Sequence, residues 1–231
     1  MLNDCLRYLS NYMVTRKGLY GLFSNPGFGK TTFMINLIQE FSKSGEKSLL
    51  FSLELLEQQV LDKMNRFKMS SNGLRIFDFP RCTSDIIAEK IQTEKPGCVF
   101  IDYLQLLDFD KNRCDLLKDL KETAVRFSVP IFFTGQLYRG SGDYDFFNRR
   151  HELYDLIYLF PSDTSLGNAR CALANLDLVM FLHRPHDCDR NIGTAHRYNI
   201  SNSAELIIKQ KHVPDLPVSF HFDFREIDRL M

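Results

Sequence analysis

The sequence has no tryptophan, no net charge and no long apolar run. Its 29 Lys and Arg residues balance 29 Asp and Glu residues in a chain of 231, which argues against a protein that coats nucleic acid through bulk positive charge. Nowhere do about 18 apolar residues follow one another, and the first residues lack the basic and then apolar pattern of a secretory signal. We therefore expect a cytoplasmic protein with no membrane span.

Cysteine pairs that would mark a disulfide framework or a zinc site are also missing. The six cysteines are Cys5, Cys82, Cys98, Cys114, Cys171 and Cys188. They form no CxxC pair and no cluster with histidine at the spacing of zinc ligands, so we interpret them as reduced thiols. A chain of this length buries about 70% of its unfolded surface, and its folding requires no covalent or metal cross-link.

What the sequence does have is an alternation of strand-length apolar runs and helix-period segments. The runs are 19–23, 48–53, 74–77, 98–101, 130–134, 178–182, 205–208 and 218–222, and the helical segments are 31–42, 56–67, 84–94 and 115–127. Most of the runs are continuously apolar, which is typical of strands that helices cover on both faces. The pattern predicts an α/β fold with a mostly parallel, twisted sheet. The last two runs have no helix between them and predict a β-hairpin at the sheet edge.

Two further segments bear on the domain organisation. Residues 2–13 carry apolar side chains at the spacing of an amphipathic helix, and this helix either packs on its own domain or docks on a neighbouring subunit. Residues 139–175 are rich in Gly, Ser, Asp and Asn and predict a long loop with short helical pieces. We find no internal repeat and no interdomain linker. We expect a short N-terminal helix within residues 1–16 and a single domain over residues 17–231.

A phosphate-binding loop follows the first predicted strand and opens the first helix of the domain. It consists of Ser24, Asn25, Pro26, Gly27, Phe28, Gly29, Lys30, Thr31 and Thr32. It matches the pattern GxxxxGK[ST], except that Ser24 stands in place of the first glycine. Gly27 and Gly29 let backbone N–H groups turn toward a β-phosphate at the helix N-terminus. Lys30 is expected to reach the β- and γ-phosphate oxygens, and the Thr31 hydroxyl to complete the Mg²⁺ shell.

Two acidic residues end apolar strands downstream of this loop. Glu54 follows the run 48–53, on a strand that we expect next to the phosphate-loop strand, where its carboxylate would polarise an attacking water near the γ-phosphate. The alternative is a solvated acid that begins a helix. Asp102 follows the run 98–101 in the Walker B pattern, in which the carboxylate orients Mg²⁺ or its waters.

Taken together, these segments resemble a known family. The series SNPGFGKTT, FSLE, FIDYLQLL, VPIFFTGQLYR, LDLVMFLHR and AELIIKQK is similar to the C-terminal motor domain of DnaB-type replicative helicases, a RecA-like hexameric ATPase that uses ATP and Mg²⁺. The resemblance implies that Glu54 is the catalytic base, that Asp102 is the metal-side acid, and that Gln136 is a polar sensor linking the γ-phosphate to the DNA loops. It also implies that Lys209 and Lys211 reach the phosphates bound by a neighbouring subunit.

The chain departs from the family pattern at two basic positions. Lys211 stands where the family has an arginine finger, and a lysine keeps the charge but loses the planar fork that grips phosphate. This predicts a slower ATPase or a finger supplied from elsewhere. The arginine expected in the DNA-binding loop is missing. Arg139, Arg149 and Arg150, with aromatic residues between them, are candidates for contacts with single-stranded DNA, and an ordinary solvated loop is the alternative.

The resemblance implies a homohexameric ring that moves along single-stranded DNA during DNA replication. Only 16 residues precede the motor, where the family commonly carries a domain that binds primase or a helicase loader. We expect that the N-terminal helix serves as a short linker or that the protein relies on such partners. The alternative function is a nucleotide-binding regulatory or accessory subunit with weak or no motor activity.

Overall fold

The computed structural model describes residues 2–108, 113–137, 174–183, 186–187, 199–200, 203–209 and 219–223. Among these residues the helices are α1 (Leu2–Thr15), α2 (Lys30–Ser42), α3 (Glu57–Arg66), α4 (Ser84–Glu94) and α5 (Arg113–Arg126), and η1 (Leu104–Leu106) is a 3₁₀ turn. The strands of the main sheet are β1 (Leu19–Ser24), β2 (Ser48–Ser52), β3 (Leu74–Phe77), β4 (Cys98–Asp102), β5 (Ile131–Gln136), β6 (Leu178–His183), β9 (Ser203–Lys209) and β10 (Ser219–Asp223). A separate short pair consists of β7 (His186–Asp187) and β8 (Asn199–Ile200).

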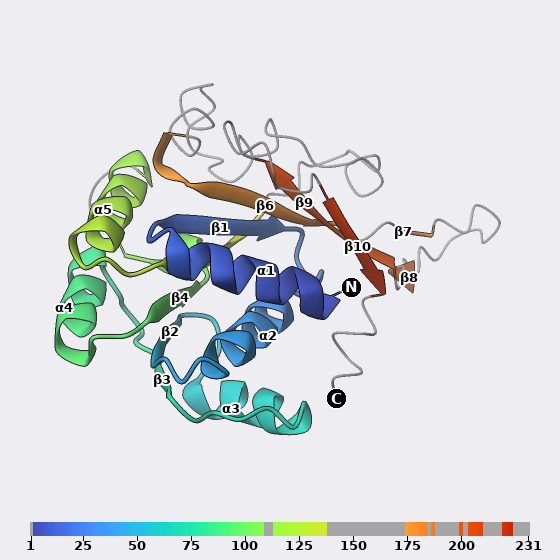
Figure 1. Ribbon diagram of the computed structural model, residues 1–231, viewed down its shortest axis with the longest axis horizontal. Coiled ribbons are helices and arrows are strands. Elements are labelled where there is room, and N and C mark those ends of the chain that lie inside the picture. The colour runs from blue at the N-terminus through green and yellow to red at the C-terminus, as the bar shows by residue number, and fades with distance from the viewer. Residues whose placement is uncertain are drawn as a thin grey trace.

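The main sheet is mostly parallel and has the strand order β10-β9-β6-β1-β5-β4-β2-β3 (Figure 1). Strands β1 to β6 pair in parallel, whereas β9 runs antiparallel to both β6 and β10. The β9–β10 pair lies at one edge, so the predicted parallel sheet with an edge hairpin is confirmed. Parallel strands need crossover connections, and the helices between the early strands supply them.

Alternate side chains of each strand enter two separate cores, one on each face of the sheet. On one face, residues such as Phe23, Phe51 and Phe133 pack with the apolar sides of α4 and α5. On the other face, neighbours such as Phe100 and Phe132 pack with α1, α2 and α3. Because both faces are covered, the strands are apolar along their whole length, which explains the continuous runs in the sequence.

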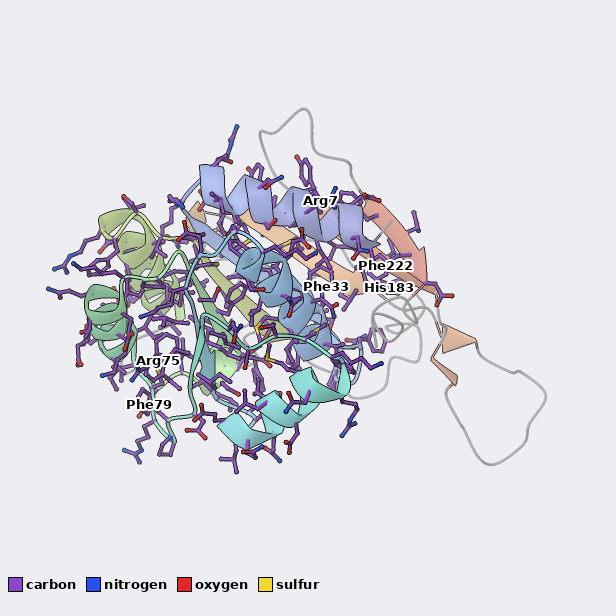
Figure 2. All side chains as sticks on the ribbon, turned by 60° about the horizontal axis from the view of Figure 1, so that its bottom comes forward. Arg7, Phe33, Arg75, Phe79, His183 and Phe222 are labelled. Carbon is purple, nitrogen blue, oxygen red and sulfur yellow. The ribbon has the colours of Figure 1, made fainter. Side chains whose placement is uncertain are left out.

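Helix α1 is an integral part of one of these cores. Its apolar side chains Leu2, Cys5, Leu6, Leu9 and Met13 are each at most 2% exposed and belong to the cluster that also contains side chains of α2 and the sheet. At the sheet edge the ring of Tyr8 lies 6.2 Å from that of Phe220 on β10, and Figure 2 places the buried Phe222 of the same strand near α1. Of the two roles expected for this helix, packing on its own domain is the one that the structure confirms.

The structure corrects one expectation about strand order. The strand that precedes Glu54 was expected beside the phosphate-loop strand β1, but β5 and β4 lie between β1 and β2. The physical reason is that β5, which comes later in the chain, inserts between β1 and β4 and pairs with both. Among the described residues, no helix is long and apolar enough to cross a membrane.

Candidate nucleotide-binding site

The phosphate loop connects β1 to α2 at the carboxyl edge of the parallel strands. Gly27 and Gly29 have φ values of 77° and 93°, a left-handed backbone conformation that favours glycine. Gly29 is the N-cap of α2, and no side chain of the described residues caps the helix there. The first N–H groups of α2 and the positive end of its dipole therefore face the loop without a side-chain acceptor, which suits an anionic ligand.

Lys30, the first residue of α2, is turned into this loop. Its side chain is buried, and Nζ donates to the carbonyl oxygens of Ser24 at 3.5 Å and Asn25 at 3.4 Å. Burial lowers the pKa of the Lys30 ammonium, while the carboxylates of Asp102 and Glu54 act in the opposite direction. The Lys30 ammonium is held by long hydrogen bonds to neutral carbonyl oxygens. Hydrogen bonds to charged phosphate oxygens are stronger, so a bound phosphate can replace these carbonyls.

Asp102 ends β4 and meets the Thr31 hydroxyl of α2. Asp102 as a whole residue is 2% exposed. Thr31 Oγ1 donates to its Oδ2 at 2.7 Å, and Thr134 Oγ1 of β5 donates to its Oδ1. The peptide bond between Asp102 and Tyr103 is cis. Two hydroxyl donors thus orient a buried carboxylate toward the first turn of α2, which brings the predicted Walker A threonine and Walker B acid together.

Glu54 lies just beyond the end of β2, in an exposed turn. Leu53 N donates to Asp102 O at 2.8 Å, so the turn continues alongside the end of β4. The hydroxyl of Ser52 donates to Leu55 O at 2.5 Å and closes the turn around Glu54. Although its strand is not adjacent to β1, the Glu54 carboxylate acts on Lys30 and also contributes to the raised pKa of Tyr103, which is due first to burial. Glu54 is therefore at the same edge as Lys30 and Asp102.

Gln136 is the last residue of β5, between the phosphate loop and the Asp102 strand. It is opposite Ser24 in the β1–β5 register, and Leu137 N donates to Ser24 O at 3.0 Å. On the other side, the side-chain amide of Gln105 bonds to both backbone polar groups of Gln136. The predicted sensor position is thus fixed at the centre of the site.

The residues at this edge fit a bound phosphate and Mg²⁺. The Thr31 hydroxyl and the Asp102 carboxylate are oxygen donors of the kind that Mg²⁺ prefers. Both polar atoms of the Asn25 side chain are buried and have no hydrogen-bond partner in the described part of the chain. A buried amide without a partner is costly, and a polar ligand in this loop is one way to satisfy it.

Other predicted site residues are less completely defined. Pro26 and Thr32 lie in the loop and in the first turn of α2, and the ring of Phe28 is buried beneath the loop. Lys209 ends β9, opposite Val179 in the register with β6. The remaining predicted residues, Lys211, Arg139, Arg149 and Arg150, lie outside the described residues, as does most of the predicted loop over residues 139–175.

Two residues at the site were not predicted from the sequence. Thr134 is fully buried in β5, and a threonine in an apolar run is typical of any strand. Gln105 lies in η1, three residues after Asp102. Its position within the segment DYLQL was a signal for the family, but the spacing alone does not show that its amide turns back onto β5.

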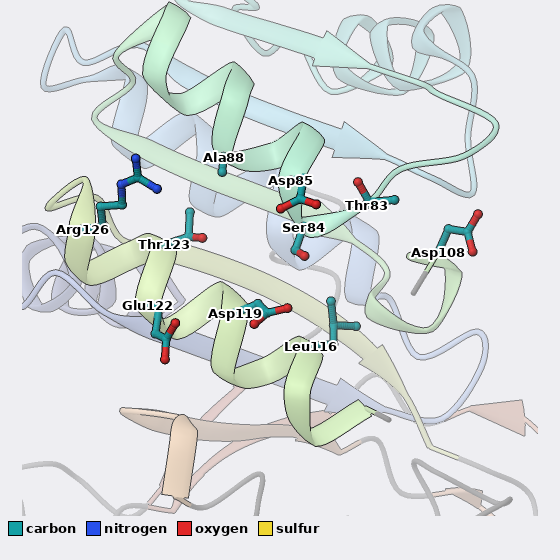
Figure 3. A pocket seen from close by; sticks show the side chains of 10 residues that line it. All are labelled: Thr83, Ser84, Asp85, Ala88, Asp108, Leu116, Asp119, Glu122, Thr123 and Arg126. Carbon is teal, nitrogen blue, oxygen red and sulfur yellow. The ribbon is translucent and has the colours of Figure 1, made fainter. Parts of the chain in front are cut away.

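A cavity of about 520 Å³ opens elsewhere, between α4 and α5. Figure 3 shows the side chains that line it, among them Asp85 of α4 and Asp119, Glu122 and Arg126 of α5. None of the predicted site residues lines this cavity. The chemistry expected from the sequence therefore lies at the carboxyl edge of the sheet, away from this hollow.

No protein-family model matches the chain, but several curated proteins are similar in sequence. The replicative DNA helicase DnaB of Mycoplasma pneumoniae is 27% identical in an alignment that covers 86% of this chain and 50% of that protein. The replicative DNA helicase DnaC of Bacillus subtilis is 24% identical over 90% of this chain and 51% of its own length. The chain spans about half the length of the curated relatives it matches. The predicted resemblance to DnaB-type replicative helicases is confirmed.

Solved structures show the same fold. One of them, an isolated ATPase domain, has a TM-score of 0.69 at 21% identity, covering 90% of this chain and 81% of that one. A DnaB-like replicative helicase, described with its interactions with primase, has a TM-score of 0.64 at 20% identity, covering 89% and 56%. The KaiC-like protein PH0186 from Pyrococcus horikoshii OT3 has a TM-score of 0.60 at 16% identity, covering 89% and 85%. The predicted RecA-like fold is confirmed.

Proposed function

We propose that this chain, a relative of DnaB-type replicative helicases, is an ATP-hydrolysing helicase motor that acts on DNA during replication. The observation that carries the proposal is the meeting of Thr31 Oγ1 and Asp102 Oδ2 at 2.7 Å beside the buried Lys30. These three groups come from the start of α2 and the end of β4, which are 71 residues apart in the chain. A loop that merely turns from a strand into a helix has no need of this arrangement.

Each residue at the carboxyl edge has a defined task in this proposal. Lys30 releases the carbonyls of Ser24 and Asn25 and binds phosphate oxygens, while the first N–H groups of α2 hold the β-phosphate. Thr31 and Asp102 would hold Mg²⁺, which would neutralise charge on the phosphate oxygens. Glu54, exposed at the same edge, accepts a proton from the attacking water as general base.

The oligomeric ring and the DNA contacts are also part of the proposal. Lys209 and Lys211 would supply positive charge to a nucleotide held by the neighbouring subunit, and Gln136 would report the state of the γ-phosphate. Arg139, Arg149 and Arg150 would contact the phosphates of single-stranded DNA. The support for these roles is the sequence resemblance. A primase or a helicase loader is the protein partner that we propose, since one structural neighbour is described with primase.

The test is ATP hydrolysis by the purified chain, with and without single-stranded DNA. We expect hydrolysis to require Mg²⁺, to rise on addition of DNA and to be abolished by Lys30→Ala. Lys43→Ala is the matched control because Lys43 is an exposed lysine just beyond the other end of α2, paired with Glu40 at 2.5 Å. Hydrolysis that is indifferent to DNA, or equal in the two variants, would refute the proposal.

The second candidate, a regulatory subunit that binds nucleotide, is favoured by Lys211 and by the missing arginine of the DNA-binding loop. If the arginine finger has been reduced to a lysine, Lys211→Arg should raise turnover strongly, because a finger contributes orders of magnitude in rate. No change in turnover, together with no strand displacement by the wild-type chain, would favour the regulatory role.

A further inference from the structure

The end of β5 extends beyond the strand that covers one of its sides. The pairing of β4 with β5 ends at Ile101 and Phe133, because the chain turns away after Asp102. On its other side, β5 stays paired with β1 as far as Ser24 and Gln136. The backbone polar groups of Gln136 that face β4 would therefore lack a strand partner.

The side chain of Gln105 takes the place of the missing strand. Its Nε2 donates to Gln136 O at 2.7 Å, and Gln136 N donates to its Oε1 at 3.2 Å. A side-chain amide carries one donor group and one acceptor, like a peptide unit, so it can bond to the N–H and C=O of one strand residue at once. A glutamate of the same shape lacks the donor, and alanine lacks both groups.

Beyond the end of the β4–β5 pairing, side-chain hydrogen bonds join the described residues of Asp102 and η1 to β5 at two places, and this pair is one of them. The other is the hydroxyl of Thr134, which donates to Asp102 Oδ1. Thr134 and Gln136 are two residues apart on one strand, so their side chains point to the same face. The turn η1 therefore connects Asp102, the expected metal-side acid, to the backbone of Gln136, the expected sensor residue.

We propose that Gln105 is a positioning residue that acts through Gln136. It holds the end of β5 at a fixed place relative to Asp102 and the phosphate loop, so that the Gln136 side chain meets the γ-phosphate in the geometry that hydrolysis needs. This inference rests on the proposed function, because it assigns Gln136 the sensor role at the same site. The competing possibility is that the hydrogen bonds between Gln105 and Gln136 only stabilise the fold.

The test is a double-mutant cycle on ATP turnover with Gln105→Ala, Gln136→Ala and the double variant. A displaced active-site group costs roughly 10- to 100-fold in rate, so we expect Gln105→Ala to lower kcat by that factor while the KM for ATP stays within about twofold. If Gln105 acts through Gln136, the double variant will turn over at the rate of Gln136→Ala alone. Gln92→Ala, which removes an exposed glutamine of α4, should match the wild type.

Two results would overturn the inference. In one, the double variant loses kcat by the product of the single losses, as expected for independent structural effects. In the other, Gln105→Ala lowers the melting temperature but leaves kcat unchanged. If the wild-type chain does not hydrolyse ATP, the proposed function fails. The affinities of the same variants for a fluorescent ATP analogue and for the corresponding ADP analogue are then measured, and the ratio of the two affinities replaces kcat in the double-mutant cycle. A ratio that Gln105→Ala leaves unchanged would refute the positioning role in that case.

Discussion

The backbone at Gly29 offers a sharp test of the phosphate site. Gly29 has a φ of 93° and immediately precedes the first N–H groups of α2. An alanine resists this conformation, so Gly29→Ala should shift the backbone toward negative φ and turn those N–H groups away from the bound phosphate. Gly45 provides a matched control: its φ is 75°, and a Cβ there would meet no atom within 4 Å.

The size of each effect follows from the structure. Forcing alanine into the left-handed region costs roughly 1–2 kcal/mol, and both variants should lose this amount of stability. For a chain of this size that corresponds to a melting temperature lower by about 2–8 °C. A ligand at 100 times its dissociation constant stabilises the folded state by about 2.7 kcal/mol, or about 5–11 °C by the same conversion. The predicted gain from ligand is therefore as large as the loss from substitution.

The assay is thermal unfolding with and without a slowly hydrolysed ATP analogue and Mg²⁺, at 100 times the dissociation constant of the wild-type chain. The wild type and Gly45→Ala should both gain the full shift on addition of the ligand, whereas Gly29→Ala should gain none. If Gly29→Ala keeps the shift, the N–H groups at the start of α2 do not hold the phosphates. If Gly45→Ala loses it, the effect is one of global stability and the reasoning about the loop is refuted.

Two further predictions concern buried side chains. Leu9→Ala should lower the free energy of unfolding in urea by about 2–5 kcal/mol, because Leu9 is fully buried in the core beneath α1. The control Asn11→Ala, at an exposed position of the same helix, should change the free energy of unfolding by about 0.5 kcal/mol or less. Equal effects of the two substitutions would show that α1 does not belong to this core. Burial raises the pKa of Cys5 and Cys82 to about 12 and that of Cys98 well above its usual range. Since the thiolate is the reactive form, iodoacetamide near neutral pH should alkylate none of these three cysteines until the chain is denatured. If mass spectrometry finds the label on any of them in the native chain, that cysteine is not buried as the structure has it.

Much of the fold could be predicted because local patterns and tertiary packing agree. The sequence placed β3 and α4 with the bounds that the structure has, Leu74–Phe77 and Ser84–Glu94. Thr83 caps α4 by accepting from Ile86 N, and such a cap marks a helix start in the sequence. The strand order could not be predicted, because periodicity says which segments are strands and not which strands are neighbours. The wrong placement of the strand before Glu54 beside β1 follows from this limit.

The site was predictable only where its chemistry requires particular residue types. Lys30, Thr31 and Asp102 stand out because a phosphate loop followed by an acid at the end of a buried strand is rare outside nucleotide-binding sites, and the carboxyl ends of parallel strands bring them to one edge. Thr134 and Gln105 were not predicted, because each owes its role to a partner on another segment. Their hydrogen bonds to Asp102 and Gln136 depend on the strand order.

That strand order also determines how a movement of the phosphate loop can be transmitted to Asp102. The phosphate loop follows β1 and Asp102 ends β4, but β5 lies between them. The hydrogen bond from Thr31 to Asp102 therefore spans the end of β5. Any change in the distance between the phosphate loop and Asp102 must be accommodated there, because the end of β5 is bonded on both sides: Leu137 N donates to Ser24 O, and Gln136 bonds to Gln105. Because the end of β5 is bonded on both sides, a small displacement of the phosphate loop or of η1 also displaces β5. The position of Gln136 between the phosphate loop and Asp102 is thus a consequence of the insertion of β5 between β1 and β4.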